Sequence, residues 1–168
     1  NVGINSSSSK VIFNDLNEDR INNLESEIQK ANLNNIQAFY RNEDCNAFLK
    51  GLDLAGFKKQ YNTLLLYDPY NASIDWGAVT PFLNIWGEVI LNHMVSDTSR
   101  GISQAKKPEV IERYKETYQK DIASIIRIGN DKKQLNEVII SIVNNRRTQA
   151  PSQKYIASFP FFNRTNGL

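Results

Sequence analysis

The sequence predicts an α/β fold built on a parallel sheet, and three observations indicate it. Short apolar runs alternate with segments of helical periodicity over residues 10–67, in the order β-α-β-α-β. Successive runs end about 30 residues apart, which is the length of one β-α-β unit. The run at residues 61–67 is largely apolar on both faces, the composition expected of a parallel strand that is covered on both sides.

Composition narrows the class of protein. A chain of 168 residues, 40% hydrophobic and 23% charged, can form one domain with a real core, so we expect a single domain over residues 1–168. A net charge of +2 gives no strong field, so a large nucleic-acid surface does not follow from charge alone, and a local basic patch stays open. The lone Cys45 excludes an internal disulfide framework and a cysteine-rich zinc site. No apolar run approaches the roughly 20 residues of a membrane span, so we expect a soluble, cytoplasmic protein.

The first elements follow from capping and periodicity. Residues 1–9 are polar and Ser-rich and predict a loop, and residues 10–14 predict a strand. Asn17 is expected to cap a helix, because acidic residues follow it in the first turn. Apolar residues recur at helical spacing along this helix, at Ile21, Leu24 and Ile28.

The next segments continue the alternation. Residues 36–40 predict a strand, and a helix is expected from Cys45 to a stop at Gly56. Its apolar side carries Phe48, Leu49 and Leu52. The strand at residues 61–67 follows.

The second half of the chain predicts more helix. Residues 73–86 indicate an interrupted helix with Thr80 as a cap and Pro81 in the first turn, and residues 87–95 predict a strand. One amphipathic helix is expected over residues 108–128, with Ile111, Tyr114, Tyr118, Ile122 and Ile125 on its apolar face.

A second helix of this pair is expected to start at Asp131, with Gln134 completing a capping box. Residues 155–162 predict an aromatic strand, and Asn166–Gly167 predicts a hairpin turn. A hairpin needs a second strand, so we expect the protein to continue beyond Leu168.

Three acids lie where predicted strands end, and in an open α/β sheet ligands bind outside the carboxyl ends of the strands. Asp15 could accept hydrogen bonds from ribose hydroxyls, or it could begin the turn into the next helix. Asp44 could accept a hydrogen bond from a purine amine, or it could cap the following helix. Cys45 is expected to be a small buried residue, because no histidine lies in a partner motif.

Asp68, Pro69 and Tyr70 form the sharpest local signal. Proline after a strand-end acid forces a turn without a backbone donor, and Tyr70 offers a flat face to a planar group. These residues could hold an amino group and stack on the attached base. A plain turn is the alternative, because Asp-Pro is common in turns.

Other polar residues are open to two readings. His93 could pair with Asp97 in acid–base chemistry, although a structural histidine is the stronger expectation. Trp76 and Trp86 are expected in the core. Arg146 and Arg147, with Lys132 and Lys133, are expected on a solvated helix face or, secondarily, at a phosphate.

The segments at residues 11–20, 42–49, 65–70, 74–76 and 91–94 together resemble the class I S-adenosylmethionine-dependent methyltransferases. Within these the chain looks most like the three-Cys-motif partner family, from about Lys10 to Leu168. The resemblance implies a Rossmann-like, three-layer α/β/α sheet with an extra helical pair near residues 108–147. It also implies S-adenosylmethionine as cofactor.

By this resemblance Asp15 matches the acid that binds the cofactor ribose, and Asp44, with Cys45 beside it, lies at the adenine. Asp68, Pro69 and Tyr70 match the catalytic loop that resembles Asp-Pro-Pro-Tyr in amino-methyltransferases, with one proline in place of two. The family's first strand and glycine-rich loop would precede Lys10. We therefore expect a sheet incomplete at both ends and an internal piece of a longer protein.

These features predict methyl transfer to an amine or a nucleic-acid base, with much of the rate coming from positioning. The alternative is a non-catalytic module whose helices at residues 108–147 contact a partner protein, because a fold does not fix an activity. A nucleotide-binding dehydrogenase is a third, weaker reading, since the Asp68 turn has no evident role in hydride transfer.

Overall fold

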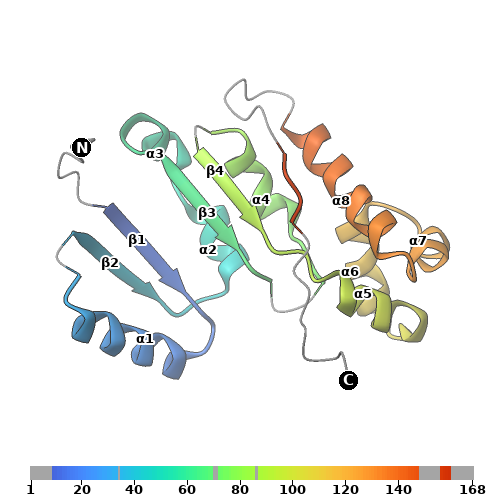
Figure 1. The fold of residues 1–168 in the computed structure, drawn as a ribbon, viewed down its shortest axis with the longest axis horizontal. Helices are drawn as coiled ribbons and strands as arrows, with labels where there is room; N and C mark the ends of the chain where they lie inside the picture. The colour runs from blue at the N-terminus through green and yellow to red at the C-terminus, as the bar shows by residue number, and fades with distance from the viewer. Residues whose placement is uncertain (1–8, 34, 70–71, 86, 148–155, 160–168) are drawn as a thin grey trace. The chain divides into compact units, whose positions relative to one another are not determined.

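The computed structural model describes residues 9–33, 35–69, 72–85, 87–147 and 156–159 (Figure 1). The chain is an α/β protein with two pairs of parallel strands. It forms two compact units, Asn1–Leu52 and Asp53–Leu168. Each unit is described below by itself, and the expectation of a single domain stays a prediction.

The first unit is a β-α-β element followed by a short helix. Its strands β1 (Ser9–Asn14) and β2 (Ile36–Arg41) run parallel, and helix α1 (Glu18–Ala31) connects them. The side chain of Asn17 accepts a hydrogen bond from the Arg20 amide at the start of α1, which confirms the predicted cap. Helix α2 (Cys45–Gly51) follows β2.

The second unit begins with another β-α-β element. Helix α3 (Leu54–Gln60) precedes β3 (Thr63–Tyr67), and α4 (Trp76–Leu83) connects β3 to the parallel strand β4 (Gly87–Leu91). Helix α4 packs against β4. The buried side chains of α4 form the centre of the core of the second unit. They are Trp76, Ala78, Val79, Phe82 and Leu83.

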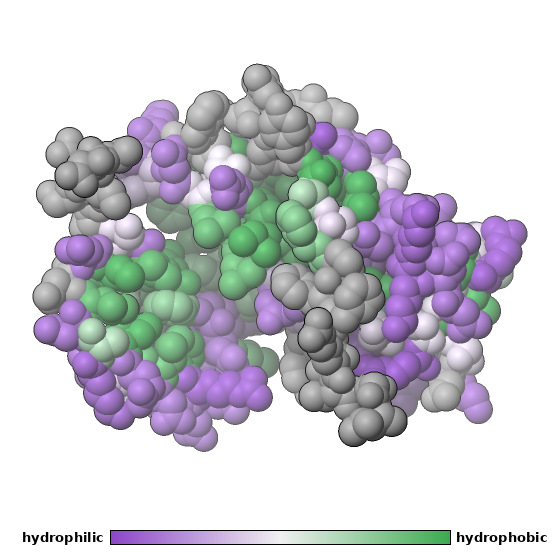
Figure 2. Space-filling model, viewed as in Figure 1, coloured by the Kyte–Doolittle hydropathy of each residue, from purple (hydrophilic) through white to green (hydrophobic). Residues whose placement is uncertain are grey.

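One face of the β3–β4 pair is apolar and exposed. Leu64 is 61% exposed, Leu66 65% and Ile90 52%. Figure 2 shows apolar side chains gathered over these two strands. The strands therefore carry apolar residues on both faces, as the sequence predicts for parallel strands, and the described residues of the second unit leave those on one face exposed.

The remaining helices complete the second unit. They are α5 (Val95–Gly101), the 3₁₀ helix η1 (Ile102–Gln104), α6 (Pro108–Tyr118), α7 (Ile122–Ile128) and α8 (Lys132–Arg146). Helices α6 and α7 pack against each other and on α8. Ile125, Leu135 and Ile139 are buried there, so the predicted apolar faces do form a core.

Two helix predictions are wrong in the same way. The helix expected from Cys45 to Gly56 is two helices, because Asp53 accepts the Gly56 amide and starts α3. The helix expected over residues 108–128 is also two helices. Gln119 adopts a left-handed conformation with φ 49°, and Asp121 then caps α7. Each aspartate offers the backbone a new helix start inside an apolar pattern that continues across it.

Two boundaries around β4 also differ from the prediction. Helix α4 starts at the cap Asp75, so Pro81 lies inside the helix and not in its first turn. Strand β4 ends at Leu91, and Val95 already begins α5. The Asp75 side chain accepts the Ala78 amide, which decides where the helix begins.

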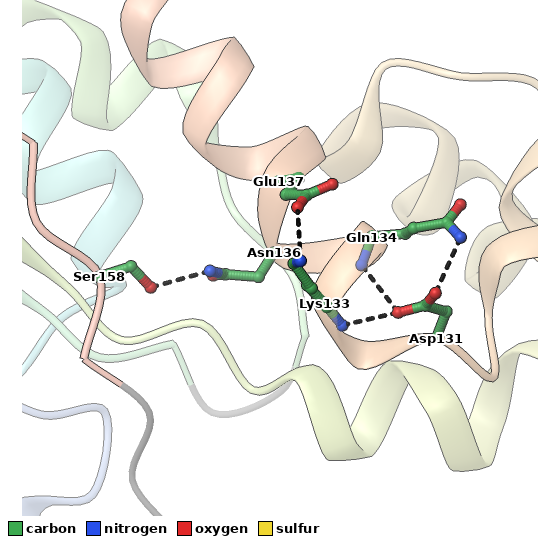
Figure 3. Close-up of polar contacts among 6 residues, drawn as sticks. All are labelled: Asp131, Lys133, Gln134, Asn136, Glu137 and Ser158. Carbon is green, nitrogen blue, oxygen red and sulfur yellow. Dashed lines mark hydrogen bonds and ion pairs between the residues drawn. The ribbon is translucent and has the colours of Figure 1, made fainter.

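Helix α8 starts at Asp131 as predicted (Figure 3). Oδ1 of Asp131 accepts the backbone amides of Lys133 and Gln134, and Oδ2 accepts the Gln134 side-chain amide at 2.8 Å. The Gln134 side chain thus contacts the capping carboxylate, whereas in a capping box it would contact the capping residue's backbone amide. These bonds, first those from Gln134, hold the pKa of Asp131 below its usual value.

The predicted aromatic strand near the carboxyl end is not observed where the structure describes it. Residues 156–159 form no strand, and Ser158 accepts a hydrogen bond from Asn136 of α8 at 2.8 Å (Figure 3). The rest of residues 155–162 and the turn at Asn166–Gly167 lie outside the described residues.

Candidate functional site

The predicted site residues fall into two groups. Asp15, Asp44 and Cys45 belong to the first unit, at the carboxyl end of the β1–β2 pair. Asp68 and Pro69 belong to the second unit, at the carboxyl end of the β3–β4 pair. Tyr70 lies outside the described residues. Each strand pair therefore presents its own rim of polar side chains.

Asp15 follows β1 directly and holds the turn into α1. Its Oδ1 accepts the Asn17 amide at 2.8 Å, and its Oδ2 lies 3.7 Å from Nη1 of Arg20. The sequence left open whether Asp15 begins the turn into the next helix, and the structure shows that it does. The Asp15 side chain is still 38% exposed, and an ionised carboxylate has about four acceptor positions, so it can accept further hydrogen bonds.

Asparagine side chains tie the two strand ends of the first rim together. Nδ2 of Asn42 donates to the Asp15 carbonyl at 2.9 Å. Asn14 donates to the Glu43 carbonyl at 3.0 Å and accepts the Glu43 amide at 3.3 Å. Because Asn14 lies opposite Arg41 in the register, its side chain reaches the loop that follows β2. Sequence reasoning missed both asparagines, although each lies at or next to a predicted strand end.

Asp44 caps α2, since its Oδ1 accepts the Ala47 amide at 2.8 Å. The capping role is therefore observed, and the proposed contact with a purine amine would use the remaining acceptor positions. Cys45 is exposed, so the expectation of a buried residue is wrong. As the first residue of α2 it lies on the outer surface of the helix start, where its Sγ is 3.7 Å from Oδ1 of Asn46.

The second rim is centred on Asp68 and Asn92. Nδ2 of Asn92 donates to Oδ1 of Asp68 at 2.6 Å, and the Asn92 backbone amide donates to the Tyr67 carbonyl at 2.9 Å. Both side chains are exposed, and Pro69 is half-buried. One carboxylate oxygen of Asp68 is fixed by this bond, while its exposure leaves the carboxylate open to a ligand.

The loop after β3 is held at its far end as well. The Asp75 amide donates to Oη of Tyr67 at 3.2 Å, and the Ile74 amide donates to Oγ1 of Thr117 at 3.0 Å. Tyr67 is 3% exposed, so one buried side chain both precedes Asp68 and contacts the backbone at Asp75. The predicted site segment thus leaves β3 beside Asn92 and returns to the core at residues 74–76.

His93 is a structural histidine in this arrangement. Its Nε2 lies 2.8 Å from Oη of Tyr118, and that hydroxyl donates to Oγ1 of Thr98 at 2.7 Å. His93 therefore donates through Nε2–H, and Nδ1 is left as the unprotonated acceptor. Asp97 pairs with Arg100, so the acid–base pair of His93 and Asp97 does not form.

Burial lowers the pKa of His93 to about 4, and the nearby Asn136 side chain opposes this shift. Nδ1 is enclosed and has no well-formed hydrogen bond among the described residues. Desolvation likewise raises the pKa of Tyr118, with a partial opposing effect from Thr98. Both side chains are therefore neutral near pH 7, and neither is a proton carrier at the rim.

The sequence predicts that Arg146 lies on a solvated helix face, and this prediction is wrong. Its guanidinium carbon is 5.3 Å from the centre of the Trp76 ring, and its Nη1 donates to Oγ1 of Thr80 at 2.9 Å. The expectation that Trp76 belongs to the core is confirmed, because the residue is 5% exposed. Trp86 lies outside the described residues.

No three His, Cys, Asp or Glu side chains in the part of the chain that the structure describes come together as metal ligands. Across the same residues, no helix has both the length and the apolar character needed to cross a membrane.

Comparisons with protein-family models, curated proteins and solved structures found no match to this chain.

Proposed function

We propose that this protein is an S-adenosylmethionine-dependent methyltransferase with a Rossmann-like, three-layer sheet. Asp15 would accept hydrogen bonds from the cofactor ribose, and Asp44, with Cys45 beside it, would lie at the adenine. Asp68 and Pro69, with Tyr70, would receive the group that is methylated, an amine or a nucleic-acid base. We propose a cytoplasmic location for this activity.

One repeated arrangement carries the proposal. In each parallel pair an aspartate directly follows the first strand and an asparagine directly follows the second. The asparagine side chain donates to that aspartate in both pairs, from Asn42 to the Asp15 carbonyl and from Asn92 to the Asp68 carboxylate. Polar groups fixed at the carboxyl ends of parallel strands are the usual ligand-binding groups of open α/β sheets.

The two rims offer chemistry that suits this reaction. The partly exposed Asp15 carboxylate has acceptor positions left for two vicinal hydroxyls. The Asp68 carboxylate is exposed and fixed on one oxygen, so it can accept a hydrogen bond from an amine and orient its lone pair. When bound, S-adenosylmethionine supplies the electrophilic methyl group. The residues of this chain contribute binding and orientation.

Titration calorimetry of the full-length protein with S-adenosylmethionine tests the proposal. We expect Asp15→Asn to weaken binding by about ten-fold, the effect of losing one hydrogen bond to a charged group. This substitution keeps an Oδ1 acceptor for the Asn17 amide, so the turn into α1 is preserved.

Asp19→Asn is the matched control, because it removes the same charge from the first turn of α1. It should change the affinity less than about two-fold, as expected for an exposed charge. Equal effects of the two substitutions would remove Asp15 from the cofactor site. Absence of binding by the folded wild-type protein would overturn the proposal and favour the non-catalytic interaction module.

A further inference from the structure

The last turn of α6 carries two adjacent polar residues that are fully enclosed. Thr117 is 1% exposed and Tyr118 is 0% exposed. Buried polar groups are stable only when they are hydrogen-bonded, so the partners of these side chains are fixed parts of the core. Gln119 follows in a left-handed conformation and ends the helix, which sets the position of this turn.

Thr117 holds the end of the loop that follows β3. Its Oγ1 accepts the Ile74 amide at 3.0 Å, and its carbonyl accepts Nε1 of Trp76 at 2.9 Å. Residues 74–76 are thereby fixed to a helix that is distant in sequence, since Ile74 and Thr117 are 43 positions apart.

Tyr118 holds the loop that follows β4. Its Oη accepts from Nε2 of His93 and donates to Oγ1 of Thr98 in α5. The rings of His93 and Tyr118 also meet edge to face, with centroids 5.6 Å apart. His93 is the residue after Asn92, so this contact fixes the backbone directly beside the asparagine that binds Asp68.

We infer that Thr117 and Tyr118 are positioning residues for the Asp68–Asn92 pair. Thr117 fixes Ile74, at the far end of the segment that starts with Asp68, and Tyr118 fixes His93, the residue after Asn92. The strand pairing places Asp68 beside Asn92, and we expect the helix turn to hold the geometry of their 2.6 Å bond. The role of this pair in receiving an amine rests on the proposed function, whereas the positioning itself does not.

Nuclear magnetic resonance of the unliganded protein tests the inference, with three substitutions. Thr117→Val removes the Oγ1 acceptor at nearly constant shape, Thr117→Ser keeps it, and Tyr118→Phe removes only the hydroxyl. We expect the Ile74 amide to exchange roughly ten-fold faster in Thr117→Val, which corresponds to loss of one hydrogen bond, and to recover in Thr117→Ser. The side-chain amide signals of Asn92 should shift in Thr117→Val and in Tyr118→Phe.

Ile139→Val is the matched control, because it trims a buried residue of α8 that is 3% exposed and has no polar group. It lowers stability without touching the network, so the Asn92 signals should stay in place. Unchanged Asn92 signals in Tyr118→Phe, or an equal shift in Ile139→Val, would overturn the inference. Since no cofactor is used, failure of S-adenosylmethionine binding would leave this result unaffected.

Discussion

Replacing Trp76 by alanine is expected to lower the free energy of unfolding by about 3 to 5 kcal/mol, the usual cost of truncating a buried aromatic side chain. Trp76 is 5% exposed and lies at the start of α4. Its indole nitrogen donates to the Thr117 carbonyl, and its ring lies against the Arg146 guanidinium. The substitution therefore removes apolar contacts, one buried hydrogen bond and one cation–π contact together.

Denaturant unfolding followed by circular dichroism measures this loss, since the signal does not depend on the tryptophan. Trp76→Phe is the matched control, because it keeps an aromatic ring and removes the indole donor. It should cost about 1 to 3 kcal/mol, as expected when a buried carbonyl loses its partner. A loss below about 1 kcal/mol for Trp76→Ala would contradict the central position of this side chain in the second unit.

The sequence predicted the elements whose signals are local. Strands β1 to β3 and helices α1 and α8 appear close to where periodicity places them, and Asn17 and Asp131 cap as expected. The helix breaks at Asp53 and Asp121 were not predicted, because the apolar periodicity of the sequence does not mark them. Apolar residues keep their helical spacing across both sites, and in each case the break depends on a side chain accepting a backbone amide three residues later.

The candidate site was predictable in part. The aspartates stand out because each directly follows a strand signal or precedes a helix signal. Asn42 and Asn92 do not, since their importance depends on which residue of the neighbouring strand lies opposite. Thr117 and Tyr118 act across 20 to 43 positions in sequence, from Thr98 at the nearest to Ile74 at the farthest. No local sequence pattern predicts contacts between residues so far apart in the chain.

Lowering the pH is expected to remove about 3 kcal/mol of stability through His93 alone. The folded-state pKa of His93 is about 4, below the ordinary value of 6.5 that it regains on unfolding. The unfolded chain therefore binds a proton more readily between these values. The contribution is fully present above about pH 6.5 and is lost as the pH falls to about 4.

Protonation is unfavourable here because burial desolvates the charged ring, and the Asn136 side chain offsets part of this cost. The only histidine of the chain is His93, so its ring signal can be followed by magnetic resonance without assignment of others. That titration should give a pKa far below 6.5.

The matched variant is His93→Gln, which retains a side-chain donor for Oη of Tyr118 and cannot titrate in this range. Between about pH 6.5 and 4 the stability of the wild type should fall more steeply than that of the variant. Aspartates such as Asp131, whose pKa is lowered in the folded state, also lose stability in acid, but they do so equally in both proteins. Only the difference between the two curves reports on His93. Parallel curves, or a measured pKa near 6.5, would mean that the ring is hydrated and that Tyr118 does not hold the loop after β4 through it.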